Sequence, residues 1–224
     1  MFGTELGIDL RWPVASRYVL RPAVGDYISK GELAIFPAEN SVVDWRRPLE
    51  DTPGLYAEFA ALDGSEKSCL DFAHKHGVLI VSEYTPENMD AFNIETVGKW
   101  REGIKYIKEV IAFCEYCSSK PAEAFRQFKN KELSLHGPGE FSLSMKSSRS
   151  PLSLDVRFNS LLAAMEFEAA KSIISGRKST QCIECSKWFE VGSGGRRSQA
   201  KFCSPRCKDS YHNRLKASKR DKEK

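Results

Sequence analysis

The chain has 224 residues, of which 41% are hydrophobic and 29% charged, and its formal net charge is +4. This length allows a sizeable hydrophobic core in one or two domains, and no apolar run approaches the ~18–20 residues that cross a bilayer. Residues 1–5 lack the basic-then-apolar pattern of a secretory signal. We therefore expect a soluble protein of the cytoplasm.

Charge is divided unevenly along the chain. Residues 176–224 hold fourteen Lys or Arg and five Asp or Glu, a formal charge of +9. The totals of 34 and 30 leave 20 basic and 25 acidic residues for the first 175, a formal charge of −5. We place an α+β body in residues 1–176 and a basic module in residues 177–224. The module is expected to bind a polyanion, the alternative being a basic tail that keeps the protein soluble.

The N-terminal part of the body predicts short strands followed by two short helices. Residues 1–50 contain short apolar stretches broken by Pro and Gly, as short strands do. Thr52-Pro53 has the form of a helix start, and that helix should continue to Leu62. Ser65 should cap a second helix that ends at His76-Gly77.

The clearest periodic pattern predicts a long amphipathic helix over residues 100–114. Its apolar residues are four, three, four and three apart and so form one stripe: Trp100, Ile104, Ile107, Ile111 and Cys114. Such a stripe packs into a core. Because Cys114 lies on it, we interpret the Cys114–Cys117 pair as packing rather than as a redox site.

The pattern changes to a period of two over residues 141–156, which predicts a β-hairpin around a polar turn. A disordered Ser-rich linker is the alternative. A second long helix should span residues 158–174, end at Gly176 and lead directly into the C-terminal module. The expected fold class is α+β: a mainly helical body with short strands and a hairpin, plus a small C-terminal zinc finger.

Four of the seven cysteines form two close pairs near the C-terminus. Cys182 and Cys185 are separated by two residues, and Cys203 and Cys207 follow after a loop. An odd number of cysteines, with four of them clustered, is unlike the disulfide framework of a secreted protein. Two close pairs separated by a loop have the spacing of a structural zinc site, so we predict that these four residues bind Zn2+.

The second pair also predicts where a helix begins. Ser204 is a typical helix cap and Pro205 suits the first helical position, so Cys207 should lie in the first turn of a helix over residues 205–218. There the positive end of the helix dipole favours a thiolate. A knuckle, a hairpin and a helix that supplies the last ligands describe a treble-clef finger. Four thiolates leave no open coordination position, so the zinc should be structural.

One set of residues carries a resemblance to a known family: Cys182, Cys185, Trp188, Phe189, Arg196, Arg197, Ser198, Phe202, Cys203, Ser204, Cys207, Tyr211 and Arg214. This set resembles bacterial proteins with a C-terminal CGNR-type treble-clef zinc finger. The literal Cys-Gly-Asn-Arg signature is replaced here by Cys207-Lys208-Asp209-Ser210. Residues 48–79 are similar to N-terminal parts of such proteins, less specifically. The resemblance implies a transcription-regulator-like protein whose variable N-terminal domain leads through a helix into the finger.

Basic side chains on the finger are the candidates for nucleic-acid contact. Cys207, Tyr211 and Leu215 are four apart and should face the finger's interior. Arg and Asn on an exposed helix read base edges, whereas Lys mainly neutralises phosphates. The expected contact residues are Arg196, Arg197, Lys201, Arg206, Asn213, Arg214, Lys216 and Arg220.

We expect a DNA-binding protein, with RNA left open, whose body senses a signal or forms a homodimer. A structural or protein-contact finger is the second hypothesis. A nuclease using His212-Asn213 is a third. Both residues come after the last cysteine, and no carboxylate or second His stands at a spacing that would build a catalytic metal site. We therefore expect a binding protein and not an enzyme.

Overall fold

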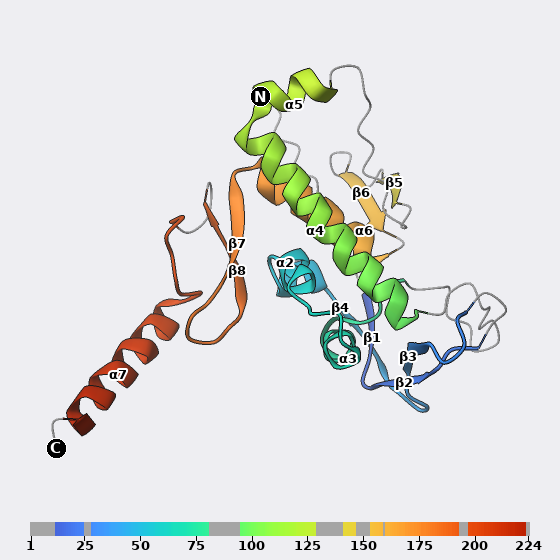
Figure 1. The fold of residues 1–224 in the computed structure, drawn as a ribbon, viewed down its shortest axis with the longest axis horizontal. Coiled ribbons are helices and arrows are strands. Elements are labelled where there is room, and N and C mark those ends of the chain that lie inside the picture. The colour runs from blue at the N-terminus through green and yellow to red at the C-terminus, as the bar shows by residue number, and fades with distance from the viewer. Residues whose placement is uncertain are drawn as a thin grey trace.

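A computed structural model describes residues 12–24, 28–80, 95–128, 141–146, 153–158, 160–192 and 197–222. Helices and short antiparallel strands are mixed along the chain, which confirms the α+β class (Figure 1). Within these ranges no helix is both long enough and apolar enough to span a membrane.

The N-terminal strands form two antiparallel pairs, as the short apolar stretches predicted. Strand β1 (Trp12–Ala15) pairs with β4 (Val43–Arg46), and β2 (Tyr18–Pro22) pairs with β3 (Leu33–Pro37). The Trp12 side chain is buried, and its indole N–H donates to the carbonyl of Val78 at 2.8 Å. This bond satisfies the one polar atom of a large buried ring and fixes β1 against the segment that follows α3.

Three short helices follow: α1 (Pro48–Asp51), α2 (Leu55–Ala60) and α3 (Glu66–His76). The predicted start of α2 at Thr52-Pro53 is wrong, because Gly54 is its N-cap. Gly54 has φ +84°, a left-handed conformation that suits a residue without Cβ. The predicted cap of α3 is confirmed, since the Ser65 hydroxyl accepts a hydrogen bond from the Ser68 amide.

The long helix predicted from the apolar stripe is α4 (Val97–Ser119). Trp100, Ile104, Ile107 and Cys114 are buried as predicted, whereas Ile111 is only partly buried. The stripe packs against α6, so these side chains form the centre of the main core. A further helix, α5 (Pro121–Phe128), was not predicted from the sequence.

The predicted hairpin is confirmed as β5 (Phe141–Lys146) and β6 (Ser153–Phe158), with Leu143 opposite Val156. Leu152 lies outside the described residues. Helix α6 (Leu161–Ile174) begins later than predicted, because Phe158 ends β6 and the Ser160 hydroxyl caps the helix at the Ala163 amide. Residues 161–166 at its start are all buried, so the buried side chains do not form a single stripe there, since α4 and α2 both pack on the helix.

The C-terminal part consists of β7 (Arg177–Gln181), β8 (Trp188–Gly192) and α7 (Pro205–Lys222). Gly176 ends α6 in a left-handed conformation, as predicted, and the chain turns there into β7. β7 and β8 form an antiparallel hairpin beside the body, and α7 extends away from both (Figure 1).

Polar contacts join this hairpin to helices α2 and α6. The Ser179 hydroxyl on β7 donates to the Tyr56 hydroxyl on α2 at 3.0 Å. Glu190 on β8 accepts from Ser172 on α6 at 2.6 Å and from Arg177 at 2.8 Å. The hairpin is therefore fixed to the body by side chains from two helices. The domain boundary at residue 176 stays a prediction, because the chain on both sides of it packs together.

Glu168 of α6 lies in the same region. It accepts a hydrogen bond from the Gly54 amide at 3.1 Å, while its Oε2 is enclosed without a partner among the described residues. Burial disfavours the charged carboxylate and raises the pKa of Glu168 to about 8, despite the Gly54 amide. The joint between body and hairpin thus encloses a carboxyl group that retains its proton at neutral pH.

The α4–α6 core predicts that truncating two different isoleucines has unequal effects on the free energy of unfolding. Ile107 is fully buried, whereas Ile174 at the end of α6 is 72% exposed. Replacing Ile107 by Ala leaves a cavity and should lower the free energy of unfolding by about 2–5 kcal/mol. Ile174→Ala is the matched control, with an expected change within about 0.5 kcal/mol. Urea denaturation measures both, and equal losses would contradict this description of the core.

The enclosed Glu168 predicts an unusual pH dependence. The folded protein keeps a proton that the unfolded chain loses between pH 4.5 and about 8, so this group lowers stability as pH rises through that window. Glu168→Gln cannot ionise and should gain about 2–4 kcal/mol of unfolding free energy over the wild type between pH 5 and pH 8. Urea denaturation at both pH values tests this. Glu102→Gln, exposed on α4, should show no such change, and a pH-independent Glu168→Gln difference would be evidence against it.

Candidate metal centre and nucleic-acid interface

The first cysteine pair lies in the turn between β7 and β8. The Cys182 amide donates to the Lys187 carbonyl and the Ser186 amide to the Cys182 carbonyl, both at 2.9 Å. Ser186 has φ +57°, which closes this tight turn. Two residues between Cys182 and Cys185 thus place both sulfurs on one side of a knuckle, as the spacing predicted.

The second pair lies at the start of α7. The Ser204 hydroxyl accepts from the Cys207 amide at 3.1 Å, which confirms the predicted cap and places Cys207 in the first turn. Cys203 immediately precedes the cap. The Ile183 amide donates to the Lys201 carbonyl at 3.2 Å and holds this segment against the knuckle.

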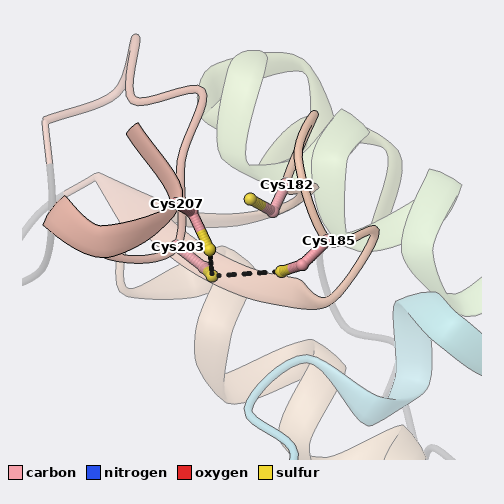
Figure 2. A group of neighbouring side chains, drawn as sticks. All are labelled: Cys182, Cys185, Cys203 and Cys207. Atoms are coloured by element: carbon pink, nitrogen blue, oxygen red, sulfur yellow. Dashed lines mark hydrogen bonds between the residues drawn. The ribbon is translucent and has the colours of Figure 1, made fainter. Parts of the chain in front are cut away.

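All four sulfurs lie within 4.8 Å of one another (Figure 2). Cys203 Sγ is 3.4 Å from Cys185 Sγ and 3.5 Å from Cys207 Sγ. A tetrahedral ion with metal–sulfur bonds of ~2.3 Å would hold its four sulfurs ~3.8 Å apart, so the cluster is close to the size that such an ion needs. The four cysteines can therefore coordinate a metal ion, and as thiolates they would leave no position for a substrate.

The thiols of Cys182 and Cys203 in this cluster differ in pKa. Burial of Cys182 opposes ionisation, but backbone amides of Cys203, Cys185 and Glu184 donate to its sulfur and lower its pKa to about 6. Burial, together with hydrogen bonding to the neighbouring sulfurs, raises the pKa of Cys203 to about 12. The first thiol of the cluster ionises readily, whereas ionisation of the remaining thiols becomes favourable only when a cation binds.

A small apolar core supports the cysteines. Phe189 and Val191 of β8 are buried with Cys182, and Phe202 packs against them. Strand β8 therefore covers the cysteine site through Phe189. With so few buried side chains, this part of the chain gains little stability from apolar burial alone.

The predicted nucleic-acid contacts have different surroundings. Those that are exposed and form no ion pair within the described part of the chain are Arg197, Lys201, Arg206, Asn213 and Lys216. Arg196 lies outside the described residues, and Arg220 belongs to α7 but its side chain lies outside the described part. Arg214 is engaged within the finger, where its guanidinium is 2.7 Å from Glu184 Oε2 and lies over the Tyr211 ring.

Glu184 was not predicted to be part of the site. Its side chain is only 12% exposed, and it accepts hydrogen bonds from both Ser210 and Arg214 of α7. It thereby ties the knuckle to the second and third turns of the helix. The only indication of this role in the sequence is that Glu184 is an acidic residue between two cysteines of a basic segment.

Leu215 was predicted to face the interior of the finger, and that prediction is wrong. Tyr211 is partly buried against Phe202, but Leu215 one turn later is 42% exposed. Helix α7 continues beyond the small core of the finger, and no described helix or strand lies beside its later turns (Figure 1).

His212 lies next to aromatic rings, with its centroid 6.1 Å from Phe202 and 5.7 Å from Tyr211. In the part of the chain that the structure describes, the four cysteines are the only cluster of His, Cys, Asp or Glu that could hold a metal ion. The geometry therefore offers His212 a packing role.

No family model matches the chain, and comparison with curated proteins and with solved structures gave no significant match. The resemblance to CGNR-type proteins rests on the cysteine, aromatic and basic residues of the finger.

The cysteine cluster predicts one metal ion per chain. Cys182→Ser removes the buried ligand and should abolish stoichiometric metal, since three thiolates bind a metal ion far more weakly than four. Cys117→Ser is the matched control, because Cys117 is a partly buried cysteine of α4 outside the cluster. Elemental analysis of the purified proteins identifies and measures the metal. Metal retained in Cys182→Ser, or absent from the wild type, would contradict this site.

Proposed function

We propose that the protein is a zinc-dependent nucleic-acid-binding protein, of the transcription-regulator-like CGNR type, that binds double-stranded DNA through a treble-clef finger. Zinc is the proposed ion because four soft thiolates in a closed tetrahedral set suit it and leave no open position. In this proposal the ion fixes the knuckle to the start of α7, and the finger acts by binding rather than by catalysis.

The observation that carries the proposal is the exposure of basic side chains on a helix that extends away from the body (Figure 1). Helix α7 has 18 residues, about 27 Å of helix, which is enough to follow a DNA groove. Arg206 and Asn213 are two turns apart and so lie on one face, where they would read base edges, and Lys216 would neutralise phosphate. Arg197 and Lys201 would add backbone contacts.

The state of the cysteines supports the proposed compartment. All seven cysteines are free, including the four of the cluster. Zinc thiolates persist where thiols stay reduced, as in the cytoplasm, and a regulator that binds DNA acts there in bacteria.

A structural or protein-contact role is the second candidate, and one observation favours it. Arg214 and Arg177 are both committed to ion pairs, with Glu184 and Glu190, that hold the finger and its hairpin together. Two of the basic side chains in this part of the chain therefore stabilise its fold through ion pairs. This candidate predicts a co-purifying protein and a weak, salt-insensitive response to nucleic acid.

Binding of the zinc-loaded protein to random duplex DNA across a salt series tests the proposal. Affinity should fall steeply with salt. Arg206→Ala/Lys216→Ala should weaken binding roughly tenfold or more and reduce the salt slope by about 1 for each phosphate that is no longer neutralised. Lys105→Ala/Lys108→Ala is the matched control, since it removes the same charge from the exposed face of α4.

Three outcomes separate the candidates. No binding at low salt would rule out the nucleic-acid function and leave the protein-contact role. Equal losses of affinity in both double variants would mean that net charge alone, and not α7, determines binding. Cleavage of plasmid by the wild type with magnesium or manganese would overturn the proposal that the finger only binds.

A further inference from the structure

Strand β4 has an exposed apolar surface at the edge of its sheet. Trp45 is 63% exposed, and Val42 and Val43 are 73% and 48% exposed. Val43 and Trp45 are two apart on the strand and therefore lie on the same face. Exposed apolar edge strands favour pairing with another chain, and soluble proteins normally protect them.

The backbone of β4 is also open on its outer side. Ser16 donates to the Val42 carbonyl at 2.8 Å, and hydrogen-bonded pairs alternate along an antiparallel ladder, so Val43 and Trp45 direct their N–H and C=O groups away from β1. Pro13, which lacks an N–H, stands opposite Trp45, consistent with this alternation. Among the described residues, nothing outside the ladder hydrogen-bonds to the backbone of Val43 or Trp45.

The charges on the other face of the strand are self-complementary. Asp44 and Arg46 flank Trp45 and lie 3.2 Å apart, both exposed. If two copies of β4 pair antiparallel about Trp45, Asp44 of each copy stands opposite Arg46 of the other, and four charges alternate in sign. A register centred on Asp44 would instead place two carboxylates opposite each other. Charge therefore selects the register centred on Trp45.

We propose that β4 is a homodimer interface, at which a second copy of this chain adds its own β4 antiparallel about a twofold axis through Trp45. The interface combines the two backbone bonds that Trp45 exchanges with its copy, a cross-strand Trp45 pair and two Asp44–Arg46 pairs between subunits. This inference does not depend on the proposed nucleic-acid function. Should both hold, the dimer would present two fingers, and paired half-sites would be its expected target.

Charge exchange between separate chains tests the register. Asp44→Arg places two arginines opposite each other, and Arg46→Asp places two carboxylates opposite each other, so each variant alone should dimerise at least about tenfold more weakly than the wild type. Mixing the two variants restores both opposite-charge pairs and should restore the dimer as a heterodimer. The double variant Asp44→Arg/Arg46→Asp should dimerise like the wild type. Sedimentation velocity over a concentration series measures each case.

Two further variants locate the surface. Trp45→Lys should produce a monomer, whereas Ile174→Ala, which removes another exposed apolar side chain, should leave the dimer intact. Circular dichroism and zinc content confirm that each variant is folded. A wild-type monomer at all concentrations, a dimer that survives Trp45→Lys, or a mixture of the charge variants that stays monomeric would each overturn the proposal.

Discussion

Four thiol groups held within 4.8 Å of one another are the constraint on which the C-terminal part of the structure depends. Sulfurs this close cannot all ionise without a cation, since each new thiolate raises the cost of the next. Among the described residues, the buried apolar side chains beside them are Phe189 and Val191. Such a core is too small to order a knuckle, a hairpin end and a helix start by burial alone. Binding of a metal ion by the four cysteines would therefore be coupled to the folding of this region.

The β7–β8 hairpin connects the cysteine cluster to the body. Its tip carries the knuckle, and its strands bond to α2 and α6 through Ser179 and Glu190. At the tip, Glu184 ties the knuckle to Arg214 of α7. The Ser210 and Arg214 contacts of Glu184 thus fix α7 to the tip of the hairpin, while Ser179 and Glu190 fix the strands of the same hairpin to the body.

The sequence was informative where the pattern is local. Caps at Ser65 and Ser204, the α4 stripe and the cysteine knuckle each depend on residues a few positions apart, and all are confirmed. The sequence was less informative where contacts between residues far apart in the chain determine the structure. Gly54 starts α2 in place of Thr52, and its amide bonds to Glu168 on a helix far along the chain. Arg214 pairs with Glu184, 30 residues away, a contact that spacing does not reveal, and its nucleic-acid role stays a prediction. The contact roles proposed for the exposed basic residues remain predictions, because surface charge has no internal partner to fix it.

The separation of charge explains why α7 should extend away from the body. Residues 1–175 carry a formal charge of −5, which would repel a polyanion brought close to them. Screening at physiological salt reduces such repulsion beyond ~8 Å. A helix of 18 residues is about 27 Å long, so its outer turns can lie well beyond that distance. If the finger were compact, its basic side chains would lie close to the acidic body and would attract phosphate much less strongly. On a projecting helix the same side chains keep that attraction.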